Sequence, residues 1–213
     1  MDDITAQEPR VSLGISVRFT NPDKMCLDQI YNLICPSTPE KIAKIKQLRD
    51  LFDQGNYAAY KTQKNKLRVF CWSGTFDTKH GPPKNDGLLK HSGRLQIDID
   101  LRDKPRVESE QLRDQLGRDP HIEVAFLSPS GRGVKAGMLI PVCHDDRDHK
   151  QAFAAAENYV LDIYNIKIDP SCKDVRRLCF FSYDLQMIRN SEAVPLDTSK
   201  WSKKPEVREK AVL

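Results

Sequence analysis

The stretch GRLQIDIDLRD, residues 93–103, decides the fold because its polar and apolar residues alternate strictly. Side chains of a strand point alternately to opposite faces, so the pattern predicts a strand over residues 94–101 with one buried face and one polar face. Asp98 and Asp100 must then share the polar face. Two carboxylates side by side repel each other, and a cation between them would remove that repulsion.

The elements that follow this strand have an informative order. Hydrophobic periodicity predicts a helix, two strands, a helix and a final strand, over residues 106–117, 122–128, 133–142, 147–164 and 177–183. Together with strand 94–101 this gives βαββαβ, the ferredoxin-like plan of an α+β fold. In that plan the first and third strands are central, the fourth flanks the first, and helices cover one face of the sheet while the other face stays open.

The N-terminal part predicts an additional αβ unit. Its expected elements are a strand from Val11 to Phe19, a helix with Thr38 as cap and Pro39 at its first position, a helix over 56–64, a strand over 67–72 and a long loop over 77–93. We therefore expect an N-terminal αβ extension over 1–65 packed on a core over 66–195, followed by a basic tail or linker over 196–213.

Composition excludes some classes of protein. The 213 residues are 39% hydrophobic and 30% charged, and no apolar run approaches the roughly 20 residues that cross a bilayer. The acidic N-terminus lacks the pattern of a secretory signal, so we expect a cytoplasmic protein. Six cysteines without a C-x-x-C pair indicate reduced, buried thiols. A net charge of +4 decides nothing, and the basic runs at 61–68, 131–135 and 173–177 fit either solvated surfaces or phosphate contacts.

The pair Asp98 and Asp100 is a candidate metal site. Their Cα atoms lie about 7 Å apart in strand geometry, so both carboxylates can face one divalent cation or bridge two. Oxygen ligands with no nearby histidine or thiolate favour Mg²⁺ or Mn²⁺ over Zn²⁺. The alternative is a pair of exposed aspartates on a solvated sheet face.

Two further segments carry groups suited to phosphate chemistry. SPSGRGVKA, residues 128–136, has a glycine-rich turn whose N–H groups, with Arg132 and Lys135, can approach phosphate oxygens; a tight hairpin explains it equally well. Asp169 is followed within eight residues by Arg176 and Arg177, although structural ion pairing of Asp174 with an arginine is a competing explanation. If all three segments converge, they supply carboxylates for metals and cations for phosphates.

Four motifs in sequence order carry a family resemblance. WSGTF (72–76), HSGRLQIDID (91–100), SPSGRGVKA (128–136) and DPSCKDVRRLCFFSYD (169–184) are similar to motifs of the archaeo-eukaryotic primase superfamily. Within it the chain resembles primase-polymerases of the BT4734-like or VirE N-terminal type, which occur in mobile elements, phages and CRISPR-associated proteins. The resemblance covers about residues 60–190.

The resemblance implies an RRM-like palm with an additional N-terminal αβ unit and assigns roles to residues. Asp98 and Asp100 match the first metal-binding motif and Asp169 the third, so the three would be catalytic and would hold two Mg²⁺ or Mn²⁺ ions. Lys135 stands where many relatives have a phosphate-binding histidine. The implied nucleotide-binding residues are Ser130, Arg132, Lys135 and Arg177.

The implied activity is that of a DNA primase-polymerase, a nucleotidyltransferase that makes primers or extends strands on a template. Its partners would be a DNA template and primer, nucleoside triphosphates and a fused or separate helicase, and no membrane. Two alternatives remain: a non-catalytic RRM-like nucleic-acid-binding module, and a metal-dependent nuclease. A rolling-circle nuclease is disfavoured because the five histidines form no H-x-H pair, and we expect His144 and His149 on the surface at a helix start.

Overall fold

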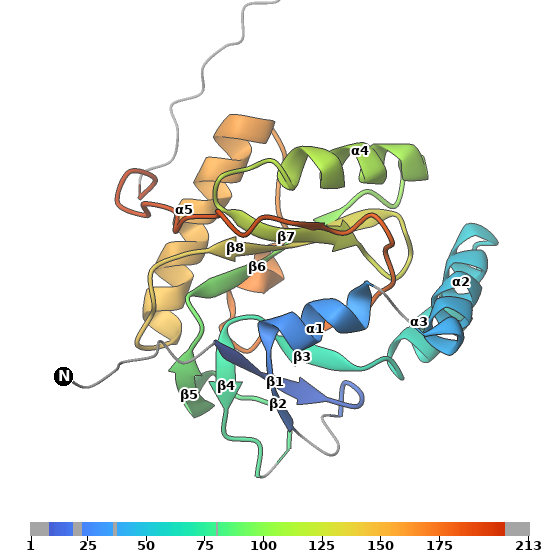
Figure 1. Cartoon of the computed structure of the whole chain (residues 1–213), viewed down its shortest axis with the longest axis horizontal. Coiled ribbons are helices and arrows are strands. Elements are labelled where there is room, and N and C mark those ends of the chain that lie inside the picture. The colour runs from blue at the N-terminus through green and yellow to red at the C-terminus, as the bar shows by residue number, and fades with distance from the viewer. Residues whose placement is uncertain (1–8, 19–22, 36–37, 80, 203–213) are drawn as a thin grey trace, which may run out of the picture.

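The computed structural model describes residues 9–18, 23–35, 38–79 and 81–202, which form a mixed α+β structure with antiparallel sheets (Figure 1). Its strands are β1 (Arg10–Gly14), β2 (Asp23–Cys26), β3 (Val69–Cys71), β4 (Gly74–Phe76), β5 (Leu88–His91), β6 (Arg94–Asp100), β7 (Ile122–Leu127), β8 (Gly133–Leu139), β9 (Leu178–Phe180) and β10 (Ile188–Arg189). Its helices are α1 (Leu27–Ile34), α2 (Pro39–Asp53), α3 (Tyr57–Lys64), α4 (Arg106–Leu116) and α5 (Asp146–Tyr164), with 3₁₀ turns η1 (Asn85–Gly87) and η2 (Pro170–Lys173).

Helix boundaries follow the capping residues in the sequence. Thr38 accepts a hydrogen bond from the Lys41 N–H and begins α2, with Pro39 at the first helical position as predicted. Asp145 caps α5 in the same way, and α5 ends where Asn165 adopts the left-handed conformation at φ 55°. The expected helices over 56–64, 106–117 and 147–164 are all present, and each differs from its expected range by one residue at one end.

One sheet contains the predicted β6 in the order β10-β7-β8-β6. The strictly alternating residues Leu95, Ile97 and Ile99 pack against α4 and α5, which cover this face of the sheet (Figure 1). Burial of these apolar side chains is the main free energy that holds the strand in register. Asp98 and Asp100 lie together on the opposite face, opposite Lys135 and Gly133 of β8.

The last strand of the βαββαβ series is not where the ferredoxin-like plan places it. We expected the strand over 177–183 to flank β6, but β9 pairs with β3 in a second sheet of order β2-β1-β3-β9. The position beside β6 is instead occupied by the chain at Asp169, whose N–H donates to the carbonyl of Asp98 over 2.8 Å.

The face of the β6 sheet that carries Asp98 is largely covered, which corrects the expectation of an open face. Phe70 of β3, together with Trp72 and Phe181, which directly follow β3 and β9, shares a core with Val124 and Phe126 of β7. Gln96, on the same face as Asp98, is only 2% exposed. The end of this face near Asp98 and Asp100 remains accessible, with the Asp98 side chain 18% exposed and the Asp100 side chain 50% exposed.

Other expectations need smaller corrections. The first strand ends at Gly14 instead of continuing towards 19, which lies outside the described residues, and β2 and α1 were not predicted. The segment 77–93 is not one long loop, because β5 pairs with β4 as a hairpin. The segment from 196, expected to be a tail or linker, begins in the core: Leu196 is buried and Trp201 packs against it.

The six cysteines form no disulfide, and four of them are buried as predicted, whereas Cys26 and Cys35 are half-buried. Among the helices described by the structure, none combines the length and the hydropathy that a membrane span requires.

Candidate active site

Asp98 forms an ion pair with Lys135, its partner across β6 and β8. The Lys135 Nζ lies 2.5 Å from the Asp98 Oδ2, and Lys135 is only 4% exposed. Burial alone lowers the pKa of Lys135, but the negative charge of Asp98 outweighs it and the net pKa is raised. Lys135 therefore stays charged, and its charge depends on Asp98.

Asp169 reaches the same place from a distant part of the chain. It caps η2, where its Oδ1 accepts the Ser171 N–H at 2.9 Å, and its Oδ2 lies 2.8 Å from the Arg177 Nη2. Burial raises the pKa of Asp169, but the hydrogen bonds of Ser171 and the charge of Arg177 outweigh that effect and lower it. Asp169 is therefore a carboxylate at neutral pH.

Ligand atoms of Asp98, Asp169 and Cys172 all lie within 4.8 Å of one another. No thiol was expected near the carboxylates from the sequence, but the η2 turn places Cys172 beside them. Burial raises the pKa of Cys172 to about 12, so it is a neutral thiol and a poor ligand for a hard cation.

Asp100 is not a member of this cluster of three. It shares the sheet face with Asp98, as alternation requires, but its carboxylate accepts hydrogen bonds from the Arg102 side chain and from the Arg102 N–H. Asp100 is half exposed at the end of β6. Of the three predicted metal ligands, Asp98 and Asp169 thus lie together, whereas the Asp100 carboxylate is paired with Arg102.

A cleft of about 320 Å³ opens at this cluster. Besides the pairs already described, Lys64 and Arg176 contribute positive charge, and the Lys64 Nζ lies 4.7 Å from the centre of the Phe180 ring. The lining residues are Val17, Lys64, Asp98, Lys135, Ser171, Asp174, Arg176, Arg177, Leu178 and Phe180. Lys64 belongs to the basic run 61–68, which fitted either a solvated surface or phosphate contacts. Nothing in the sequence of this run distinguishes Lys64, which lines the cleft, from its exposed neighbours.

Ser130 and Arg132 do not line the cleft. They belong to the tight hairpin between β7 and β8, the alternative left open above: the Ser130 hydroxyl accepts the Arg132 N–H and lies 3.0 Å from the Ser128 hydroxyl. The Arg132 guanidinium pairs with Asp53 of α2 at 2.9 Å. Gly131 has a φ of 71°, which this turn requires.

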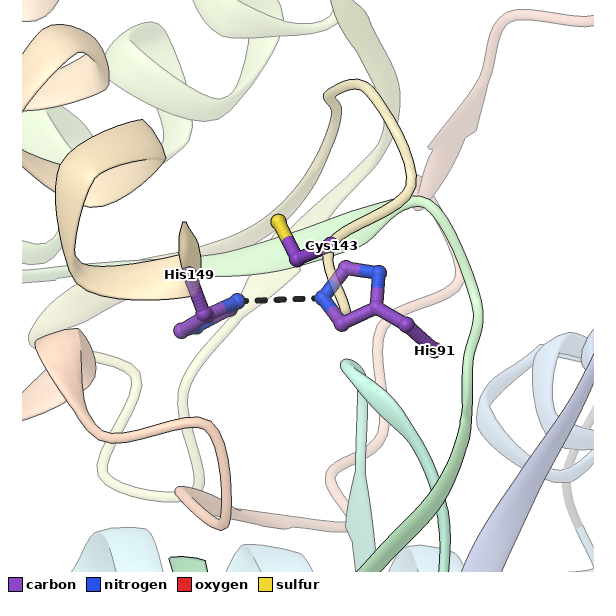
Figure 2. Close-up of side chains that lie close together, drawn as sticks. All are labelled: His91, Cys143 and His149. Carbon is purple, nitrogen blue, oxygen red and sulfur yellow. Dashed lines mark hydrogen bonds between the residues drawn. The ribbon is translucent and has the colours of Figure 1, made fainter. Parts of the chain in front are cut away.

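A second cluster lies elsewhere and was missed by the sequence analysis. Ligand atoms of His91, Cys143 and His149 lie within 4.8 Å of one another (Figure 2). His149 is fully buried, so its expected surface position is wrong, whereas His144 is exposed as expected. Neither spacing nor a local motif marks these three residues, since they come from separate elements.

Comparison with known proteins identifies a family match. A family model described as BT4734-like, N-terminal domain, matches residues 62–188, which is more than half of the chain and contains both clusters. No curated protein and no solved structure matches the chain.

Proposed function

This chain belongs to the BT4734-like N-terminal domain family, and from that premise we propose that it is a DNA primase-polymerase of the archaeo-eukaryotic primase type. In this proposal it transfers nucleotides from nucleoside triphosphates to a growing strand on a DNA template. The cleft at Asp98 is the proposed catalytic site.

One observation carries the proposal. Asp98 and Asp169 come from distant segments, yet their carboxylates lie within 4.8 Å of each other. Asp98 lines a cleft together with Lys64, Lys135 and Arg177, and Arg177 also pairs with Asp169. Nucleotidyl transfer needs this combination, because carboxylates bind divalent cations and cationic side chains bind the triphosphate. A module that only binds nucleic acid has no need for acidic groups beside phosphate.

The donor set fits a hard divalent cation through its two carboxylates and not through Cys172. Mg²⁺ and Mn²⁺ prefer carboxylate oxygens, whereas the buried neutral thiol suits neither ion. Asp98 and Asp169 would hold the ion, and Asp100 would join them for a second ion by releasing Arg102. A bound ion would neutralise charge on the phosphates and align the attacking and leaving oxygens.

In this proposal the cationic residues both neutralise the carboxylates and bind the phosphates of the nucleotide. Lys135 and Arg177 each neutralise one of the carboxylates, so they are held at the cleft without substrate. They are therefore already placed to donate to phosphate oxygens. Arg177 is one-third exposed and has the freer access, while Lys135 is buried and acts as a fixed point charge.

The proposed palm is RRM-like in its first three strands. β7, β8 and β6 are adjacent in this order with α4 and α5 on one face, and the chain at Asp169 lies beside β6 where the fourth strand was expected. This placement supports the proposal because it brings the third acidic motif next to the first.

The test is extension of a labelled primer on a DNA template with nucleotides and Mn²⁺ or Mg²⁺. We expect template-dependent lengthening by the full chain and loss of at least 100-fold in Asp169→Asn, since a catalytic carboxylate contributes to transition-state stabilisation on that order. Asp162→Asn, which changes an exposed aspartate of α5, is the matched control.

Two other outcomes would reject the proposal, and each would assign a different function. Shortening of the primer that Asp169→Asn abolishes would assign a nuclease to the same cleft. Binding of DNA without any change in strand length, in the presence of both metals and of ribo- and deoxynucleotides, would leave a binding module.

A further inference from the structure

Three potential metal ligands that have no role in the proposed reaction meet in the interior. His91 ends β5, Cys143 lies in the loop after β8, and His149 lies in the first turns of α5 (Figure 2). Their exposed fractions are 5%, 7% and 0%. Two imidazoles and a thiol rarely converge in a core by chance packing, because apolar side chains fill such space at lower cost.

The spacing of the two ring nitrogens is close to that of two ligands on one zinc ion. The His91 Nε2 lies 3.1 Å from the His149 Nδ1, and all three ligand atoms lie within 4.8 Å of one another. Two nitrogens that each lie about 2.05 Å from one tetrahedral zinc ion are separated by about 3.3 Å. The observed separation is therefore within about 0.2 Å of the value that one zinc ion requires.

The hydrogen bonds of the pair fix the proton positions on the two rings. The Gly93 N–H donates to the His91 Nδ1 at 3.0 Å, so the His91 proton resides on Nε2 and is donated to His149. His149 therefore carries its own proton on Nε2, and the lone pair of its Nδ1 faces His91. Metal binding moves the His91 proton to Nδ1 and gives up the Gly93 bond, which is a small cost beside two metal–nitrogen bonds.

More acidic than basic side chains surround the cluster. Asp145 and Asp148 act on Cys143 through their negative charge. Asp146 and Asp174 act on His149 in the same way, while Lys150, which pairs with Asp146, acts on His149 with the opposite sign. A nearby excess of carboxylates favours a bound cation and its retention.

We propose that His91, Cys143 and His149 bind one Zn²⁺ ion at a structural site separate from the Asp98 cleft. Imidazole and thiolate are the ligands that zinc prefers, and a water molecule completes the fourth position. The ion joins the end of β5, the loop after β8 and the start of α5. It thereby fixes the segment that leads directly into β6, the strand that carries Asp98 and Asp100.

The test uses the full chain loaded with Co²⁺, which reports thiolate ligands by a charge-transfer absorption band. We expect one tightly held zinc ion per chain after dialysis and, with Co²⁺, a band that disappears in Cys143→Ser. Cys172→Ser is the matched control, because it removes the thiol beside the Asp98 cleft and leaves the proposed site intact. The band must therefore persist in Cys172→Ser.

Three results would overturn the proposal. They are the absence of a thiolate band in the wild-type chain, an unchanged band in Cys143→Ser, and a band that is lost in Cys172→Ser instead. A second measurement covers variants that fold poorly: removal of zinc from the wild-type chain by a chelator must lower its melting temperature, and zinc must restore it. A melting temperature that the chelator does not change would also reject a structural ion.

Discussion

Asp98 and Lys135 face each other across β6 and β8 with 2.5 Å between the carboxylate Oδ2 and the ammonium Nζ, and Lys135 is almost fully buried. Because of this pair, a substitution of Asp98 affects stability as well as any activity. Removal of Asp98 relieves its repulsion from Asp100, but it also leaves a buried ammonium without its partner.

The first prediction follows from this pair. We expect Asp98→Asn to lower the free energy of unfolding by about 3–5 kcal/mol, the range for breaking a buried ion pair. The double variant Asp98→Asn/Lys135→Met should be less destabilised than the sum of the two single variants. Denaturant unfolding of all four proteins measures this, and additive effects would show that the pair is not coupled.

The second prediction concerns Arg113 and Asp184, which form a fully buried ion pair at the end of the DPSCKDVRRLCFFSYD motif. The Arg113 Nη1 lies 3.1 Å from the Asp184 Oδ1, and Asp184 also accepts the Leu127 N–H. Arg113→Met should lower the free energy of unfolding by about 3–5 kcal/mol, since Asp184 is then buried and unpaired. Lys104→Met, which breaks an exposed pair with Glu108, is the control and should change it by less than about 1 kcal/mol.

The third prediction addresses Arg177 and depends on the proposed function. Because Arg177 is one-third exposed, Arg177→Met should change stability by less than about 1 kcal/mol. Its loss should raise the KM for the nucleotide about tenfold or more, since one charge-assisted contact to phosphate is removed. Arg118→Met, at an exposed position, should leave KM unchanged. Equal KM values for the two variants would remove Arg177 from the site.

A fourth prediction concerns Gly137 of β8. A Cβ atom at this position would lie 2.8 Å from the Cζ3 of Trp72, which is completely buried between the two sheets. Gly137→Ala should therefore lower the free energy of unfolding by about 1–3 kcal/mol through overpacking. Gly87→Ala meets nothing nearer than 3.6 Å and should be close to neutral. Thermal unfolding of both variants tests this prediction, and equal stabilities would contradict it.

The fifth prediction is a pH dependence at Glu123. Burial raises the pKa of Glu123, but the Arg94 guanidinium at 2.6 Å and the Tyr31 hydroxyl outweigh burial, so the net pKa is lowered. A carboxyl with a depressed pKa in the folded state contributes stability above its unfolded pKa of about 4.3 and loses it as the pH falls through the folded value.

The measurement is the free energy of unfolding of the wild-type chain and of Glu123→Gln at several pH values. The wild-type advantage should be constant between about pH 6 and 8 and should shrink below about pH 4.3. A difference that does not depend on pH would show that Glu123 has the same pKa in both states.

The sequence by itself determined the secondary structure around the acidic motif. Strict alternation fixed β6 and placed Asp98 and Asp100 on one face, since side-chain direction in a strand is a local property. Capping residues fixed the start of α2, and hydrophobic periodicity identified α4 and α5, for the same reason. The hairpin at Gly131 was also among the local alternatives.

Only the tertiary structure decided which partners these residues meet. β9 pairs with β3 instead of β6, Lys135 lies under the second sheet, and Cys172 turns towards Asp169; none of these contacts leaves a periodic signal in the sequence. The cluster of His91, Cys143 and His149 is the clearest case. Long-range contacts depend on how whole elements pack to bury apolar surface, so they become visible only when the chain is folded.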